Sequence, residues 1–299
     1  MPSPNRFDTL DAMRGLAAFA VVVYHTSRPN PLGYLAVDLF FILSGFVLCH
    51  AYGGRIELVN FIRIRLIRLY PMFLAGVLVG LAIRGGNPAS LLLVPDWTSE
   101  RLYPMNTALW SVAYELLASI GFGLLYRFGW KAWLPFWAGS GLIWCSVLVQ
   151  TGQGSLGMTW DGQEFALARL TFTFTTGIAL YWLFQRYGKR IESHWAWLVC
   201  IAPVALTFWA DLPLVLALTI LLPACVLAGA IIELPAKRFA KLSGDISYPL
   251  YAIHLPIVAL FGWISVPIVL VASFLLDRYI DRPVRRWLTA KTARLVKAA

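Results

Sequence analysis

The sequence predicts an all-α polytopic membrane protein, and three observations support this class. Of its 299 residues, 59% are hydrophobic and only 13% are charged, whereas a soluble domain of this size needs a much larger charged surface. Apolar stretches of membrane-spanning length recur along the chain. The 13 tryptophans are typical of side chains that anchor helices at the two membrane interfaces.

Ten apolar stretches are long enough to cross a bilayer as helices. Charged residues interrupt the first stretch, so we expect a retained helix there and no cleavable signal peptide. We expect one transmembrane domain over residues 1–299, without an appended soluble domain. The predicted spans are residues 12–29, 34–52, 66–84, 107–126, 132–149, 165–185, 195–210, 212–232, 245–261 and 263–281.

The distribution of basic residues predicts the orientation of the spans. If the N-terminus is cytoplasmic, all but four of the 25 Lys and Arg residues fall in cytoplasmic segments, which satisfies the positive-inside rule. Ten spans then place both termini in the cytoplasm. The formal net charge of +10 is explained in this way, and we expect no nucleic-acid partner. The four exceptions are Arg28, Arg84, Arg101 and Arg169.

The four cysteines indicate neither a disulfide framework nor a metal site. All of them fall inside apolar stretches, and no two form a CxxC pair. We therefore expect no bound metal. They are Cys49, Cys145, Cys200 and Cys225.

Arg14 and His25 lie inside the first span. They are eleven residues apart, which on a helix puts them within about 20° of each other and about 16 Å apart along the axis. Ionisable residues inside a membrane are costly and favour a functional interpretation. In the alternative interpretation, His25 only caps a backbone carbonyl and Asp11 only neutralises Arg14.

Further polar residues lie inside other spans. Asp38 and Glu115 are carboxylates in the second and fourth spans, and Ser247, Tyr251 and His254 share one helical face in the ninth. Inside a membrane such a stripe suggests a polar lining. The structural alternatives are a helix-start residue for Asp38, an ion-pair partner for Glu115 and a backbone cap for His254.

Arg63, Arg65 and Arg68 form a cluster where the chain enters the third span. Guanidinium groups bind phosphate oxygens in a bidentate way, although basic residues at this place can also be simple topology anchors. Acyl transfer from a thioester to a hydroxyl needs a base, a positioned donor and a group that stabilises the oxyanion. The chain offers candidates for all three.

Five segments together resemble the acyltransferase 3 family, the integral-membrane acyltransferases that include bacterial glycan O-acetyltransferases. Residues 127–240 resemble the family only as hydrophobic spans. The segments that carry the resemblance are LDAMRGLAAFAVVVYH with Arg14 and His25, VDLFFILSGFVL with Asp38, FIRIRLIRLYP with Arg65 and Arg68, NTALWSVAYE with Glu115, and ISYPLYAIHLP with Ser247, Tyr251 and His254.

This resemblance implies a bacterial inner-membrane enzyme that uses cytoplasmic acetyl-CoA, or another acyl-CoA, and acylates a hydroxyl of a glycan or another acceptor. His25 would be the general base, with Glu115 supporting it. The donor would be bound by Arg14, Arg63, Arg65 and Arg68, and the acceptor by Asp38, Ser247, Tyr251 and His254.

Two other functions stay open at this point. The acceptor could be a small hydroxylated metabolite instead of a glycan, and the sequence does not separate these two. The intramembrane histidine and glutamate could also form the proton relay of a transporter without acyl chemistry. A transporter would not depend on an acyl-CoA.

Overall fold

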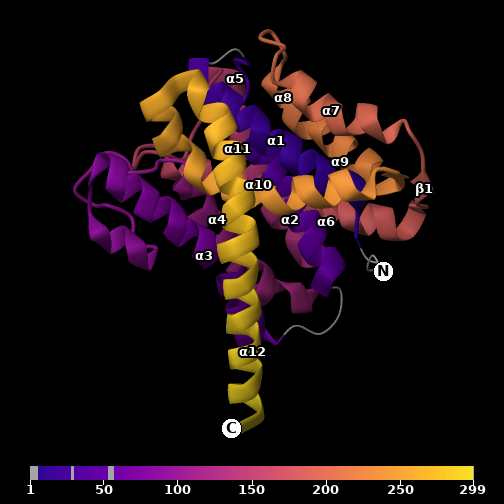
Figure 1. Cartoon of the computed structure of the whole chain (residues 1–299). Helices are drawn as coiled ribbons and strands as arrows, with labels where there is room; N and C mark the ends of the chain where they lie inside the picture. Colours follow the sequence, from indigo (N-terminus) through magenta and orange to yellow (C-terminus); the bar gives the residue numbers. More distant parts are fainter. Residues whose placement is uncertain (1–5, 28–29, 53–56, 299) are drawn as a thin grey trace.

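The computed structural model describes residues 6–27, 30–52 and 57–298. The end of the first predicted span, Arg28 and Arg55 lie outside the described residues. The described chain is predominantly helical (Figure 1). Its elements are α1 (Asp8–Ser27), α2 (Leu35–Tyr52), α3 (Leu58–Arg84), η1 (Pro88–Leu92), α4 (Leu109–Leu125), η2 (Tyr126–Phe128), η3 (Trp130–Trp133), α5 (Leu134–Thr151), α6 (Gln163–Tyr187), β1 (Ile191–Glu192), α7 (Ala196–Leu206), α8 (Leu214–Leu216), η4 (Ala217–Leu221), α9 (Leu222–Ile231), β2 (Ile232–Glu233), α10 (Lys237–Phe261), η5 (Gly262–Ile264), α11 (Ser265–Leu276), η6 (Asp277–Asp281) and α12 (Arg282–Ala298).

Within the described residues, six segments are long and apolar enough to cross a membrane. Helices α4 and α7 are shorter apolar helices. Helix α1 falls outside the six because its polar residues lower its hydropathy. Each predicted span overlaps a helix, which supports an all-α membrane protein, while the count of ten crossings and the orientation of the termini stay predictions. The six segments are Leu35–Tyr52, Leu58–Arg84, Lys131–Thr151, Gln163–Tyr187, Leu214–Ile231 and Lys237–Thr292.

Two helices begin about eight residues earlier than the apolar stretches predicted. Helix α3 begins at Leu58, not at residue 66, and α10 begins at Lys237, not at residue 245. Hydropathy marks only the apolar part of a helix, whereas the backbone hydrogen bonds continue through polar turns. The arginine cluster therefore lies on α3 itself, at fixed helical spacing. The last two predicted spans are separated at Gly262, whose φ of 51° suits glycine.

Two helix pairs at the centre of the bundle pack with their backbones in close approach. Helix α1 runs along α10, and α2 runs along α6. A Cβ atom on Gly45 would lie 2.1 Å from the carbonyl oxygen of Phe174, and one on Gly177 would lie 2.0 Å from that of Ile42. Small residues permit such contacts between membrane helices. These two pairs bring distant polar residues together.

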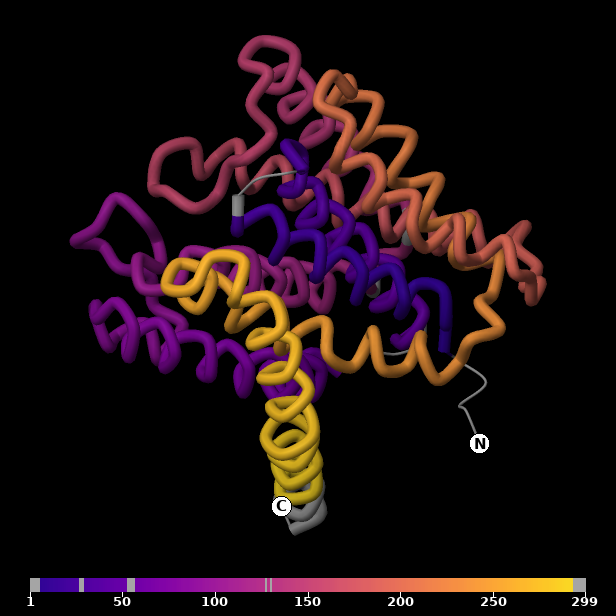
Figure 2. The backbone as a smooth tube through the Cα atoms, turned by 45° about the horizontal axis from the view of Figure 1, so that its top comes forward, coloured from indigo at the N-terminus to yellow at the C-terminus, as the bar shows by residue number. Residues whose placement is uncertain are grey.

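The final helix leaves the body of the molecule. Helix α11 continues through the π-helical turn η6 into α12, which projects from the other helices toward the C-terminus in both views (Figures 1 and 2). Its 17 residues correspond to about 26 Å. On another side of the molecule, β1 and β2 form a short parallel pair that the sequence analysis did not predict.

Candidate functional site

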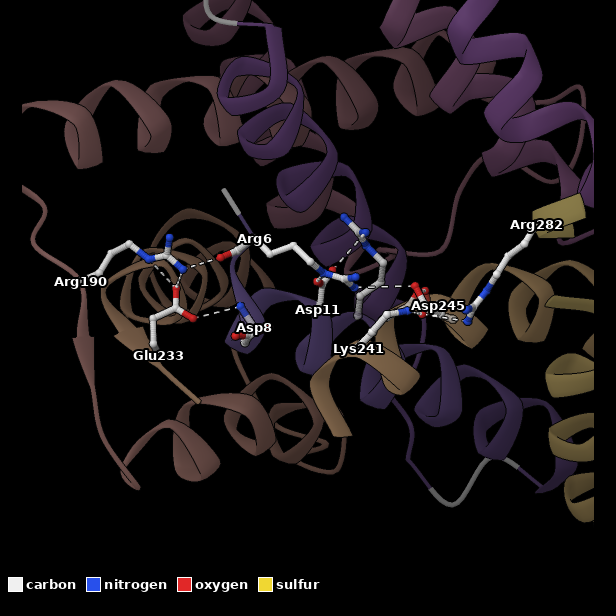
Figure 3. Close-up of polar contacts among 11 residues, drawn as sticks. Arg6, Asp8, Asp11, Arg190, Glu233, Lys241, Asp245 and Arg282 are labelled. Atoms are coloured by element: carbon white, nitrogen blue, oxygen red, sulfur yellow. Dashed lines mark hydrogen bonds and ion pairs between the residues drawn. The ribbon is translucent and has the colours of Figure 1, made fainter. Parts of the chain in front are cut away.

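One end of the helix bundle carries a network of ion pairs, which we call the charged end (Figure 3). The Arg6 guanidinium donates to Asp11 at 2.7 Å and lies 3.7 Å from Asp245. The Asp245 carboxylate also accepts from Lys241 at 2.6 Å and from Arg282 at 2.8 Å. The network joins the first turns of α1 and α12 to Lys241 and Asp245 in the second and third turns of α10, and so fixes these helices relative to one another.

The start of α1 is held at the charged end by Glu233 of β2 (Figure 3). The backbone N–H of Asp8 donates to Oε2 of Glu233 at 3.0 Å, and Nε of Arg190 donates to Oε1 at 2.8 Å. A carboxylate at a helix N-terminus accepts a hydrogen bond from an otherwise unpaired amide and interacts favourably with the helix dipole. Burial raises the pKa of the Glu233 carboxyl, and the Arg190 guanidinium opposes that shift. Together these contacts fix the start of the helix that carries Arg14.

A cavity of about 260 Å³ opens among α1, α2, α3, α4 and α10. Its lining is mixed, with guanidinium, carboxylate and hydroxyl groups among apolar side chains. Such a lining, with polar groups at defined places among apolar side chains, is typical of a ligand site. Its polar and aromatic lining residues include Arg14, Ser44, Arg65, Arg68, Ser111, Glu115, Ser247, Tyr248 and Tyr251.

Three arginines line this cavity, and they differ in how firmly the protein holds them. Arg65 donates to Glu115 at 2.7 Å and to the Ser119 hydroxyl at 3.0 Å. The ion pairs of Arg14 with Asp11 and of Arg68 with Asp281 are longer, at 3.9 and 4.0 Å. These separations exceed hydrogen-bond distance. The guanidinium groups of Arg14 and Arg68 therefore keep donors for an anionic ligand.

Arg63, the fourth arginine predicted to bind the donor, does not line the cavity. Its guanidinium donates to Asn60 on its own helix. At 100° per residue, Arg65 and Arg68 lie about 60° apart around α3, whereas Arg63 and Arg65 lie about 160° apart. Helical spacing thus separates Arg63 from the pair that faces the cavity.

Glu115, which was predicted to support His25, lies beside an arginine. Its Oε1 accepts hydrogen bonds from Arg65 at 2.7 Å and from Ser44 at 3.1 Å. The side chain is 27% exposed and lines the cavity. The structure places Glu115 where it holds Arg65 in position.

Asp38 lies in a closed ion pair outside the cavity lining. Nε and Nη2 of Arg169 each donate to the Asp38 carboxylate at 2.7 Å, and both side chains are almost completely buried. Arg169 also donates to the carbonyl oxygens of Leu156 and Tyr34, at 2.9 and 3.3 Å. Both oxygens of the Asp38 carboxylate are occupied by this bidentate pair, so Asp38 has little capacity to bind an acceptor substrate. The geometry favours a structural role for Asp38. Arg169, one of the four basic residues predicted to lie outside the cytoplasmic segments, is buried inside the bundle.

The predicted stripe on α10 divides between the cavity and the core beyond it. Ser247 and Tyr251 line the cavity, and the Tyr251 hydroxyl lies 2.7 Å from that of Ser111. Ser247 donates to the Gly244 carbonyl of its own helix at 2.7 Å. His254 is fully buried, with its ring centroid 5.5 Å from that of Tyr251. The stripe therefore leads from the cavity to His254.

The rings of His25 and His254 lie together, with centroids 5.2 Å apart. Nδ1 of His254 is 2.6 Å from the Tyr251 carbonyl oxygen. A carbonyl only accepts, so Nδ1 carries the proton, and in the neutral ring Nε2 is then an acceptor. This buried Nε2 has no hydrogen-bond partner among the described residues. His25, at the last turn of α1, is half-buried.

Sequence reasoning missed two residues that build the site. Ser111 binds Tyr251, and Asn106 donates to the carbonyl oxygens of Gly76 on α3 at 3.1 Å and Ala252 on α10 at 2.8 Å. Asn106 is fully buried. The sequence signal that could have identified it is a polar amide side chain at the start of the fourth apolar stretch. Its amide ties α3 to α10 beside the cavity.

Helices of membrane-spanning length around a cavity lined by three arginines define a membrane protein with an internal polar cavity. The chain belongs to the acyltransferase 3 family, whose acyltransferase domain matches residues 7–276. It is 48% identical over 79 residues to "Protein 2 in picA locus" of Rhizobium radiobacter, and the aligned region covers 23% of this chain and 41% of that protein. It is 30% identical over 157 residues to "Acyltransferase MdmB" of Streptomyces mycarofaciens, and the aligned region covers 42% of this chain and 41% of that protein.

The chain thus spans about two fifths of the length of each of these two relatives. No solved structure matches it.

Proposed function

We propose that this chain is a membrane acyltransferase that moves an acyl group, with acetyl as the first candidate, from acyl-CoA to a hydroxyl of a sugar or glycan. The observation that carries the proposal is the layout of one cavity. Arg14, Arg65 and Arg68 lie among its lining residues, and Tyr251 connects the lining to the pair of histidines. One connected region can therefore bind an anionic donor and supply the group that accepts the proton.

The donor is bound through its phosphates. Arg14 and Arg68 retain guanidinium donors because their carboxylate partners lie 3.9 and 4.0 Å away, and guanidinium groups suit phosphate oxygens. Glu115 keeps Arg65 oriented at 2.7 Å. With the topology that the basic residues predict, this end of the cavity faces the cytoplasmic side of a bacterial inner membrane. Acyl-CoA is supplied from that side.

His25 is the general base in this proposal. It takes the proton of the acceptor hydroxyl as that oxygen attacks the thioester carbonyl, the C–S bond breaks, and CoA leaves as a thiolate that is then protonated. Nε2 of His254, a buried acceptor without a partner among the described residues, accepts a hydrogen bond from a second hydroxyl of the sugar, because the attacking hydroxyl has only one proton and gives it to His25. Both histidines thus orient the acceptor.

The test is acyl transfer by purified protein in detergent. Radiolabelled acetyl-CoA is incubated with a panel of hexoses, deoxyhexoses and their oligosaccharides. We expect His25→Ala to lower transfer at least about a hundredfold, the usual scale for a general base, and to leave CoA binding intact. His50→Ala is the matched control, because His50 also packs among aromatic rings, those of Phe7 and Tyr181.

Full activity of His25→Ala would refute the assignment of the base. Failure of the wild-type protein to bind any acyl-CoA would refute the donor and favour the transporter. Transfer to small hydroxylated metabolites, with none to glycans, would instead identify the alternative acceptor class.

A further inference from the structure

The cavity is too small to hold a whole acyl-CoA. Its volume of about 260 Å³ lies below the roughly 300–1,000 Å³ of pockets for drug-sized ligands, and an acyl-CoA is larger than a drug. The acyl-pantetheine arm can enter a cavity of this size. The adenosine with its 3′-phosphate must then lie outside the cavity, while the diphosphate stays at the arginine-lined end of the cavity.

Arg68 connects the cavity to α12. Its side chain is 32% exposed, and Nη1 lies 4.0 Å from Oδ2 of Asp281. The same Oδ2 lies 2.6 Å from Nη2 of Arg285, on the first turn of α12. One buried carboxylate thus lies between an arginine of the cavity and an arginine of the final helix.

A shallow, open hollow lies on one face of this first part of α12, lined by Arg282, Arg285, Arg286, Thr289 and Ala290. We call it the α12 hollow. Two of its arginines are held by carboxylates, Arg282 by Asp277 and Asp245, and Arg285 by Asp281.

Arg286 differs from these two arginines. It is exposed and forms no ion pair in the part of the chain that the structure describes. The hollow therefore combines two fixed guanidinium groups with one that has no carboxylate partner, an arrangement suited to a phosphate.

We infer that the α12 hollow binds the 3′-phosphate of the CoA donor, with Arg286 as the main contact. This inference rests on the proposed function. The hollow lies beyond residues 7–276, the part matched by the acyltransferase domain. It would make the chain selective for CoA thioesters over thioesters of dephospho-CoA, which lack that phosphate.

Arg286→Ala is the informative variant, because it removes a charge that supports no ion pair and so spares the fold. Lys291→Ala is the matched control. Lys291 is an exposed cation on the same helix, about 140° around from Arg286, and its ammonium lies over the Trp287 ring.

The experiment measures the Kd of CoA and of dephospho-CoA by calorimetry, in a neutral detergent without anionic lipid. We expect the wild-type protein to prefer CoA. We expect Arg286→Ala to weaken CoA binding about tenfold, the scale of one charged hydrogen bond, without changing the Kd of dephospho-CoA. Lys291→Ala should leave both values unchanged.

If wild-type protein binds CoA but Arg286→Ala keeps the same preference for it, only the present inference is overturned. If wild-type protein binds neither compound, the proposed function itself fails. Lipid headgroups offer the same phosphate chemistry, so a second arm uses nanodiscs that contain phosphatidylglycerol. Loss of lipid binding in Arg286→Ala, with an unchanged CoA preference, would assign the hollow to headgroups and overturn the inference.

Discussion

The bundle contains two arginine–carboxylate pairs, Asp38–Arg169 and Arg65–Glu115. They consist of the same kinds of charged group, but their surroundings differ. In the Asp38–Arg169 pair both side chains are buried, at 0% and 1% exposure, and backbone carbonyls accept further donors of the arginine. In the Arg65–Glu115 pair the side chains are 11% and 27% exposed and line a cavity. The first pair is closed around itself, while the second keeps access to a ligand.

This difference shows how to separate structural from functional charges in a membrane protein. A charge inside a membrane is costly in either case. In the closed pair, protein groups satisfy that charge, and the indole rings of Trp110 and Trp144 lie 5.8 Å from the Arg169 guanidinium. At the cavity, the guanidinium groups of Arg14 and Arg68 are incompletely paired, with their carboxylate partners 3.9 and 4.0 Å away.

The largest effect should come from opening the closed pair. Arg169→Leu leaves the Asp38 carboxylate buried without its partner, and removal of one member of a buried pair costs about 3–5 kcal/mol of unfolding free energy. Thermal unfolding in detergent, followed by tryptophan fluorescence, measures the loss. The double variant Asp38→Leu with Arg169→Leu is the control and should recover much of it. A loss below about 1 kcal/mol in the single variant would contradict the comparison.

The next largest effect should appear at the cavity, in ligand binding. Arg68→Ala should weaken CoA binding by about 1.5–3 kcal/mol, the scale of a hydrogen bond to a charged group. Arg63→Ala, on the other face of α3, removes the same charge and should leave the Kd unchanged. Equal weakening by both variants in calorimetry would show that only the local net charge matters.

A smaller effect is expected when the open pair is broken. Arg65→Leu should lower the free energy of unfolding by at most about 1 kcal/mol, because Glu115 is partly exposed and screened. Thermal unfolding of this variant beside Arg169→Leu compares the two pairs directly. A loss as large as that of Arg169→Leu would mean that the cavity is not accessible to water.

The smallest effect should come from salt. Raising the ionic strength from about 0.05 to 0.5 M should weaken CoA binding a few-fold, because exposed charges are screened over distances of about 10 Å or less. The unfolding difference between wild type and Arg169→Leu should change little, because a buried pair is hardly screened. Equal salt dependence of both quantities would contradict this distinction.

Much of the local structure could be predicted from the sequence. Helix periodicity places Arg14 and His25 on one helix, α1, and the spacing of Arg65 and Arg68 puts both on one face of α3. The same spacing would have turned Arg63 away, had the helix been known to begin at Leu58. Hydropathy could not find that start, since polar turns carry no apolar signal.

The sequence by itself determined the helical membrane class and the order of polar residues along each helix, because both follow from local hydrophobicity and helix geometry. Only the tertiary structure decided the partners. It joined Asp38 to Arg169, 131 residues away, and Glu115 to Arg65, 50 residues away. Such pairings depend on which helices pack together, and close backbone contacts at glycines fix that packing. The same packing brought His25 beside His254.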